Sequence, residues 1–233
     1  MRKFNEIEAW VFDLDNTLYP LHHNLFEQVD KRMTAFIQDA LDVDRDQAYF
    51  LQKSYLREFG TSLAGLMKRH GMKPDNFLEF VHDIDVSVLT PDPALHDAIA
   101  ALPGRKFIFT NGTTRHAENV ANRLGVMGLF EDVFDIVAAN YIPKPNADIY
   151  PAMLERFNIS ADKSAFFEDM ARNLAPAHEL GMTTVLVQDT QADAQARAAA
   201  HIGDQQADSS FIHHATDDLT GFLTSIGKLH NNG

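Results

Sequence analysis

Two aspartates and a threonine alternate directly after a short apolar segment near the start of the chain. Residues 9–12 (Ala-Trp-Val-Phe) have the β-branched and aromatic character of a buried strand, and Asp13, Asp15 and Thr17 follow them. Ligands of open α/β sheets bind at the carboxyl ends of the strands. There, Asp13 could attack phosphorus to form a carboxyl phosphate, and Asp15 could protonate the leaving oxygen as a general acid. The spacing therefore indicates phosphoryl transfer.

This chemistry requires a cation, because two carboxylates that face a phosphate dianion would repel it. A hard divalent ion, Mg²⁺ above all, prefers such oxygen ligands. Asp, Asn and Thr are also ordinary turn-forming residues, so an isolated Asp-x-Asp pattern is equally typical of a capped loop. The later segments of the chain must decide between the two interpretations.

A second polar group follows the predicted strand at residues 106–109. Thr110-Asn111-Gly112 stands there, just before a predicted helix. A hydroxyl group and exposed backbone amides before a helix N-terminus form an anion site, so Thr110 and the amide of Asn111 could hold phosphoryl oxygens. The alternative is a plain strand-to-helix turn in which Gly112 supplies conformational freedom.

A single lysine stands between two prolines in Pro143-Lys144-Pro145. Each proline fixes its own φ and biases the preceding residue toward extended backbone, which would hold the Lys144 ammonium in one direction. The alternative is a solvated lysine in a proline-rich loop.

An acid pair ends a third apolar strand. Glu168 and Asp169 follow Ala165-Phe166-Phe167. They could complete an oxygen shell for Mg²⁺, with Asp169 as the direct ligand and Glu168 binding directly or through water. Asp169 also suits a role in helix capping, and both roles are compatible.

Four helical patterns without a strand signal follow the first motif, over residues 24–41, 46–59, 62–70 and 74–82. From Pro91 onward, helices and strands alternate. The predicted strands of this part are residues 106–109, 134–137, 164–167 and 183–187, with a last strand beginning at 211–212. The predicted helices are residues 94–102, 113–124, 147–157, 171–180 and 216–226.

This pattern predicts an α/β fold with a mostly parallel, doubly wound (Rossmann-like) sheet and a small α-helical cap inserted after the first strand. We expect a core domain of residues 1–19 and 89–233 and a cap domain of residues 20–88. The Ala- and Gln-rich segment 189–210 has no assigned role.

Composition excludes several function classes. With 45% hydrophobic and 23% charged residues, the chain is typical of a soluble globular protein, and it has no apolar run long enough for a membrane. The net charge of −13 argues against binding to nucleic acid polymers. The absence of cysteine and of a signal-peptide pattern favours a cytoplasmic location. No Gly-x-Gly-x-x-Gly or P-loop pattern indicates a nucleotide cofactor.

Substrate selection is expected above the site, in the cap and in the loop from residue 19 to residue 26. Aromatic faces and hydrogen-bonding groups suited to a sugar and a flat base occur there. The candidate specificity residues are Tyr19, His22, His23, Asn24 and Phe26. The histidines of the chain lack the spacing of a metal site and are interpreted as surface or substrate-adjacent residues.

In order, the four motifs resemble those of the haloacid dehalogenase superfamily, and they span nearly the whole chain. The stretches FDLDNTLYP, FTNGTTRHAENV, YIPKP and FFEDMARNLAPAHELGMTTVLV are more narrowly similar to the pyrimidine 5′-nucleotidase branch. The resemblance implies that Asp13 is the nucleophile and a Mg²⁺ ligand, and that Asp15 is the acid/base and binds the ion through its carbonyl. It also implies that Lys144 neutralises charge, that Thr110 and Asn111 bind phosphate, and that Asp169 completes the metal site.

The implied activity is hydrolysis of a nucleoside 5′-monophosphate, preferably a pyrimidine one, through an aspartyl phosphate. A phosphatase for another small ester, such as phosphoglycolate, would have the same core. A sugar-phosphate mutase would keep Asp15 and Mg²⁺ but pass the phosphoryl group to a second hydroxyl. A haloacid dehalogenase would not need Asp15, and a signalling receiver domain would lack the helical insertion.

Overall fold

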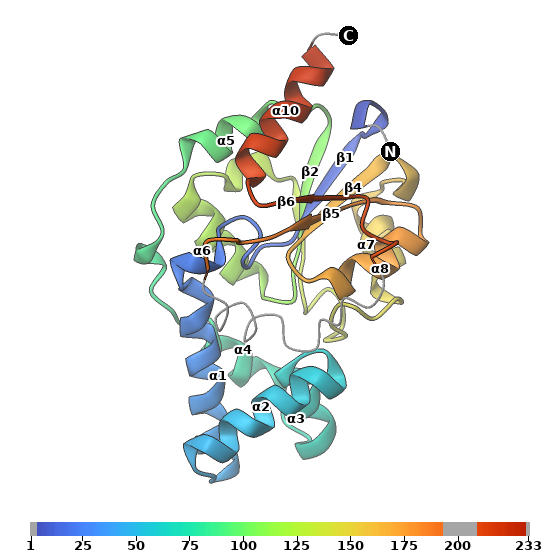
Figure 1. Ribbon diagram of the computed structural model, residues 1–233. Coiled ribbons are helices and arrows are strands. Elements are labelled where there is room, and N and C mark those ends of the chain that lie inside the picture. Colours follow the sequence, from blue (N-terminus) through green and yellow to red (C-terminus); the bar gives the residue numbers. More distant parts are fainter. Residues whose placement is uncertain (1–3, 193–208, 232–233) are drawn as a thin grey trace.

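The computed structural model describes residues 4–192 and 209–231, and its centre is a six-stranded sheet in the order β3-β2-β1-β4-β5-β6 (Figure 1). The strands are β1 (Ala9–Phe12), β2 (Arg105–Phe109), β3 (Asp132–Phe134), β4 (Ser164–Glu168), β5 (Thr183–Val187) and β6 (His214–Thr216). Every neighbouring pair is parallel. The strand order reverses at β1, so the crevice at its carboxyl end is where such a sheet binds ligands.

Helices cover both faces of this sheet. They are α5 (Pro93–Ala100), α6 (Thr114–Leu124), α7 (Ile149–Phe157), α8 (Ala171–Glu179) and α10 (Leu219–Asn231). Trp10 and Phe12 of β1 pack in one apolar cluster with α5, α6 and α10, while Ala9 and Val11 pack in another with α7 and α8. Successive side chains of a strand point to opposite faces, so a strand buried on both sides must be apolar throughout.

Four helices lie between β1 and α5 and form most of a third apolar cluster, which also includes Ile136 from the loop after β3. They are α1 (Leu25–Leu41), α2 (Arg45–Phe59), α3 (Ser62–His70) and α4 (Pro74–Val81). Asp44 caps α2 by accepting the N–H of Gln47, and Thr61 caps α3 by accepting the N–H of Ala64. Figure 1 shows these helices together beyond one end of the sheet.

The predicted α/β fold with a mostly parallel, Rossmann-like sheet is confirmed. Its division into a core (1–19 and 89–233) and a cap (20–88) stays a prediction. Short 3-10 helices complete the described elements: η1 (Phe4–Glu6), η2 (Leu21–His23), η3 (Val86–Val88), η4 (Met127–Leu129) and η5 (Ala161–Lys163). No described helix has the length and hydropathy needed to cross a membrane.

The strand predicted at residues 134–137 is misplaced, because β3 ends at Phe134. Asp135 ends it: its Oδ2 accepts hydrogen bonds from the backbone N–H and the hydroxyl group of Thr114, both at 2.8 Å. Its Oδ1 accepts the N–H of Ala138 at 2.8 Å. A side chain that binds both the start of α6 and its own loop in this way turns the chain away from the sheet.

The last strand was also predicted too early. Residues 211–212 precede β6, and Phe211 instead accepts the hydroxyl hydrogen of Thr184 through its carbonyl oxygen. Of the Ala- and Gln-rich segment, residues 193–208 lie outside the described part of the chain.

Candidate active site

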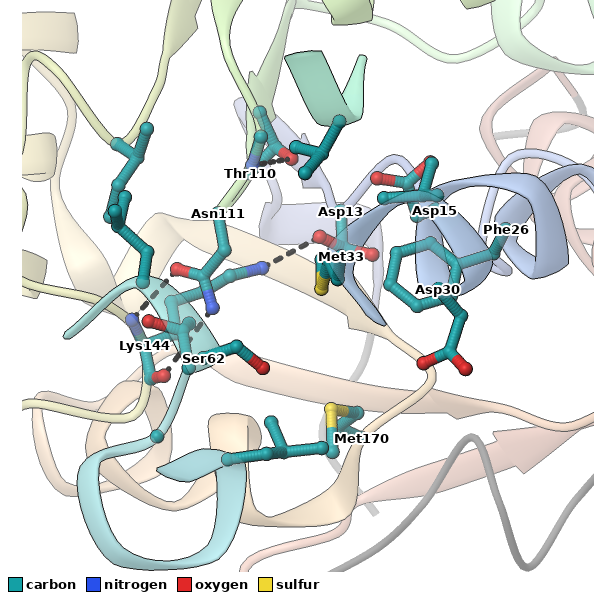
Figure 2. Close-up of a pocket in the computed structure, with 18 of the residues that line it drawn as sticks. Asp13, Asp15, Phe26, Asp30, Met33, Ser62, Thr110, Asn111, Lys144 and Met170 are labelled. Carbon is teal, nitrogen blue, oxygen red and sulfur yellow. Dashed lines mark hydrogen bonds and ion pairs between the residues drawn. The ribbon is translucent and has the colours of Figure 1, made fainter. Parts of the chain in front are cut away.

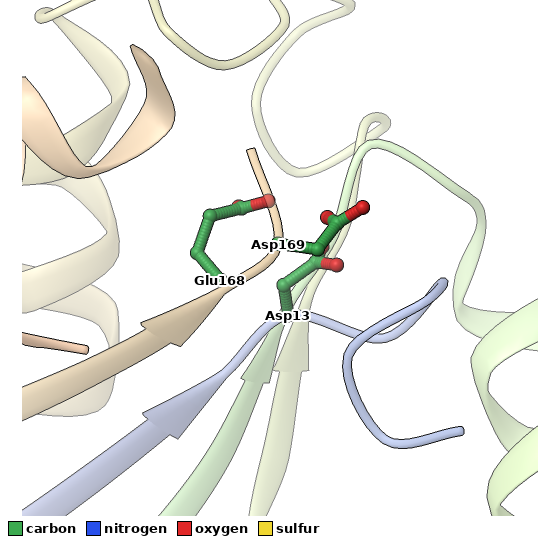
Figure 3. Close-up of side chains that lie close together, drawn as sticks. All are labelled: Asp13, Glu168 and Asp169. Carbon is green, nitrogen blue, oxygen red and sulfur yellow. The ribbon is translucent and has the colours of Figure 1, made fainter. Parts of the chain in front are cut away.

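Strands β1 and β4 bring the predicted acids together. Phe12 of β1 pairs with Phe167 of β4, and the N–H of Asp13 donates to the carbonyl oxygen of Phe167 at 2.9 Å. The residues that follow the two strands must therefore be neighbours. Asp13, Glu168 and Asp169 are all buried, and one carboxylate oxygen of each lies within 4.8 Å of the others (Figure 3).

Lys144 reaches this acid cluster from the loop that follows β3, and it is buried. Its ammonium donates to Oδ1 of Asp13 and to Oε2 of Glu168, each at 2.7 Å. A third bond, of 2.9 Å, goes to the carbonyl oxygen of Phe109. The backbone N–H of Lys144 is held by Oδ1 of Asn111 at 2.8 Å (Figure 2). The lysine predicted from its two flanking prolines therefore lies against the predicted nucleophile.

Burial, and next the crowding of carboxylates, raises the pKa values of Asp13 and Asp169. Burial, and next the charge of Glu168, raise the pKa of Asp13 to about 7, although Lys144 opposes the shift. Burial and the charges of Glu168 and Asp13 raise the pKa of Asp169 well above its usual value. Burial alone would lower the pKa of Lys144, but its two acidic partners raise it. This set of crowded carboxylate oxygens fits a hard divalent cation such as Mg²⁺.

Asp15 is held through one oxygen only. Its Oδ1 accepts the hydroxyl hydrogen of Tyr19 at 2.6 Å and Nε2–H of His116 at 2.9 Å. Burial opposes ionisation of Asp15, but His116 and Tyr19 outweigh it and lower the pKa of this carboxyl. Within the described residues, Oδ2 makes no hydrogen bond, so it is the oxygen that can exchange a proton with a ligand.

His116 joins the site although no motif identified it. Its ring stacks on that of His82, which follows α4, with centroids 4.5 Å apart. Burial, and then the charge of His116, lower the pKa of His82 to about 3, so that ring is neutral. The sequence holds one signal: His116 stands four residues before the buried Val120, on the apolar face of α6.

Thr110 and Asn111 follow β2. Together with Asp13, Lys144 and Asp169, they line one cavity. Oγ1 of Thr110 accepts the N–H of Gly112 at 2.9 Å. The side-chain amide of Asn111 holds the Lys144 loop, since its Nδ2 also donates to the carbonyl oxygen of Lys144 at 3.4 Å. Their binding of phosphoryl oxygens stays a prediction.

Most of the residues predicted to select the substrate do not line the described cavity. Of these candidates, Phe26 lines the described cavity, and the following do not: Tyr19, His22, His23 and Asn24. Tyr19 is buried beneath Asp15. His22 contacts Asp189. Oδ2 of Asp189 accepts the backbone N–H of His22 at 2.8 Å and lies 2.7 Å from Nδ1 of the His22 ring. His23 and Asn24 are exposed.

Helices of the insertion form the opposite wall of the cavity (Figure 2). Most of this wall is apolar: Phe26, Val29, Met33, Leu56, Leu63, Phe77, Leu78 and Val81. Asp30, Gln52 and Ser62 add polar groups to it. The cavity thus has a charged floor that suits a phosphate and a metal ion, and an apolar wall that suits the body of an organic ligand.

A family model described as "Hydrolase: haloacid dehalogenase-like hydrolase" matches residues 7–181. Phosphate metabolism protein 8 of Saccharomyces cerevisiae is 27% identical over 208 residues, which are 81% of this chain and 64% of that protein. The match thus spans less than two thirds of that relative. Glyceraldehyde 3-phosphate phosphatase of Methanopyrus kandleri is 24% identical over 196 residues, 78% of this chain and 84% of that protein. A solved HAD phosphatase of Thermococcus onnurineus has the same fold, with a TM-score of 0.60 at 15% identity over 96% of this chain and 97% of that one.

Proposed function

Because the chain belongs to the haloacid dehalogenase-like hydrolases, we propose that it is a Mg²⁺-dependent phosphomonoesterase that acts through an aspartyl phosphate. One observation carries the proposal: a buried lysine ammonium bridges Asp13 and Glu168, with Asp169 beside them. A purely structural ion pair would not need a third carboxylate, because desolvating each further charge costs several kcal/mol. Such crowding is typical of a site that binds a cation and an anion together.

In the proposed reaction, a carboxylate oxygen of Asp13 attacks phosphorus, and the bond between phosphorus and the leaving oxygen breaks. Asp15 gives a proton to that oxygen through Oδ2. Water then attacks the phosphorus, Asp15 takes up the proton released by the water, and the bond to Asp13 breaks, so that inorganic phosphate is formed. The low pKa of Asp15 fits the second step, and the approach of a phosphate dianion would favour its protonation for the first.

Lys144, Thr110 and Asn111 would bind the phosphoryl oxygens, with the ammonium offsetting the charge of both nucleophile and phosphate. Asp13, the backbone carbonyl of Asp15, and Asp169 would hold Mg²⁺, with Glu168 bound directly or through water. When bound, the ion would polarise the phosphoryl group and offset the carboxylate charges.

The substrate we propose is a nucleoside 5′-monophosphate, with a pyrimidine base preferred. The apolar wall of the cavity supports it, because a flat base gains free energy by leaving water there. The cap (20–88) would close this wall over the core (1–19 and 89–233). A smaller ester is the second candidate, favoured by the relative named glyceraldehyde 3-phosphate phosphatase.

The test is release of phosphate from UMP, CMP, AMP, GMP, phosphoglycolate and glyceraldehyde 3-phosphate, with and without Mg²⁺. We expect UMP and CMP to have the highest kcat/KM and Asp13→Asn to abolish turnover in a folded protein. A smaller ester that exceeds every nucleotide by tenfold or more would refute the nucleotidase proposal. Turnover of Asp13→Asn within about tenfold of wild type would refute the mechanism.

A further inference from the structure

One carboxylate of the cavity wall is held in place but is not used by the reaction proposed above. Asp30 of α1 lines the cavity, and its Oδ1 accepts two hydrogen bonds, from Nζ of Lys53 at 2.5 Å and from Nε2 of Gln52 at 2.8 Å. Its Oδ2 accepts none within the described residues. Figure 2 shows Asp30 beside Phe26 on the same helix, among the side chains that surround the cavity.

The partners of Asp30 are themselves fixed. The side chain of Lys53 is 7% exposed and that of Asp30 is 27% exposed. Gln52 is buried, and its Oε1 accepts the hydroxyl hydrogen of Thr34, so its amide can turn only one way. Burying a lysine in this way costs free energy that a well-packed apolar pair would not. The arrangement fixes one carboxylate oxygen of a cavity-lining residue and leaves the other without a hydrogen bond from the described residues.

The charges that face Asp30 determine which ligand that oxygen accepts. Across the described cavity lining there are five carboxylates, those of Asp13, Asp15, Asp30, Glu168 and Asp169, and two basic side chains, those of Lys144 and Arg172. The phosphate and its cation occupy the floor, so the leaving group lies toward the cap. Even when the ammonium of Lys53, which is paired with Asp30, is added to the two basic side chains, the five carboxylates outnumber the cationic groups. A second anion there would meet an excess of negative charge, whereas a hydroxyl or N–H group would find an acceptor.

We propose that Asp30 is a specificity-determining residue, which accepts a hydrogen bond from a hydroxyl or N–H group of the leaving group and disfavours esters whose leaving group is anionic. This inference rests on the phosphatase function proposed above. It separates its two candidate substrate classes: a nucleoside carries ribose hydroxyl groups and base N–H groups, while phosphoglycolate carries a carboxylate. The carboxylate is the group that Asp30 would repel.

Asp30→Asn tests the inference because it reverses the polarity of one atom. Lys53 and Gln52 both donate to the Oδ1 position, so the amide oxygen of the variant must stay there and its NH₂ group must take the place of Oδ2. An acceptor thereby becomes a donor with almost no change of volume. Asp39→Asn is the matched control, because Asp39 is an exposed aspartate of the same helix that does not line the cavity.

The measurement is the ratio of kcat/KM for UMP to that for phosphoglycolate, in which the fraction of folded enzyme cancels. We expect the ratio to exceed about ten in the wild type, to fall by about tenfold or more in Asp30→Asn, and to stay unchanged in Asp39→Asn. A ratio for Asp30→Asn within about twofold of wild type would overturn the proposal. If Asp30→Asn does not fold, the double variant Asp30→Leu, Lys53→Met removes the whole ion pair, and the same criterion applies.

Binding separates this inference from the function on which it rests. Calorimetry with UMP and with phosphoglycolate, in the presence of Mg²⁺, gives the corresponding ratio of dissociation constants; if the wild type hydrolyses either ester, the titrations use Asp13→Asn with and without Asp30→Asn, so that no turnover occurs. Suppose that no ester is hydrolysed, that the wild type binds UMP more tightly than phosphoglycolate, and that Asp30→Asn does not. The phosphatase proposal then fails and the role of Asp30 stands. If the esters are hydrolysed but the wild type does not prefer UMP to phosphoglycolate, the role of Asp30 fails and the phosphatase proposal stands.

Discussion

Binding of Mg²⁺ to the acid cluster is expected to compete with protons. Without a metal ion, Asp13 has a pKa raised to about 7, and the pKa of Asp169 is raised as well. Below that pH the folded protein holds protons that a metal ion must displace. The sign follows directly: the raised pKa makes metal affinity fall as the pH falls through about 7.

The magnitude follows from the pKa of Asp13 alone. About two pH units below 7, roughly one molecule in 100 has this carboxylate ionised, so the apparent affinity for Mg²⁺ falls by about 100-fold between about pH 8 and pH 5. This is ~2.7 kcal/mol, and protonation of Asp169 adds to it. His82 contributes little in this range, because its pKa of about 3 keeps it neutral throughout.

Isothermal titration of the metal-free protein with Mg²⁺ measures this effect. Runs near pH 6.5 in two buffers of different ionisation enthalpy give the number of protons released, which we expect to be about one or more. Asp169→Asn should release fewer protons than wild type. Affinity that changes by less than about threefold between pH 5 and pH 8 would refute the reasoning, since the crowded carboxylates would then hold no protons.

Two further predictions concern how individual groups serve the site. Asp169→Ala should raise the Mg²⁺ concentration needed for half-maximal activity about tenfold more than Glu168→Gln does, because Glu168 is already held by the lysine; a reversed order in the titration would make Glu168 the direct ligand. His116→Ala and Tyr19→Phe should each lower kcat about tenfold with little change in KM, because each removes a donor that orients Asp15. An increase of KM at constant kcat would instead assign these two residues to substrate binding.

The strand-end residues could be predicted because the fold is parallel. In such a sheet, every strand that follows a crossover ends at the same edge, so a local pattern, an apolar run followed by polar residues, has a spatial meaning. Asp13, Thr110 and Asp169 were each identified from their immediate neighbours in this way. For Lys144, the two flanking prolines left a solvated lysine as the alternative, and the resemblance to the family implied its role; the structure brings its ammonium to Asp13.

The specificity role of residues 19–26 stays a prediction, and most of these side chains do not line the described cavity. Residues 19–26 were judged by chemical type, but their direction depends on distant partners. His22 is held by Asp189, which lies more than 160 residues along the chain. Tyr19 is turned inward by the carboxyl of Asp15. No pattern within the segment contains this information, and only Phe26, which belongs to the apolar stripe of α1, lines the cavity.

His116 and Asp30 share a sequence signal: a polar residue on an otherwise apolar helix face. Both are polar residues on a helix face that otherwise packs: His116 precedes the buried Val120 by four residues, and Asp30 follows Phe26 by four. Such a residue needs a partner, because a buried polar group without one costs ~1–3 kcal/mol. His116 finds its partner in the proposed acid/base, and Asp30 uses one oxygen for Lys53, while we propose that its other oxygen accepts a hydrogen bond from the substrate. A polar interruption of an amphipathic stripe is therefore a reason to look for a partner of that residue in the site, as His116 shows with Asp15.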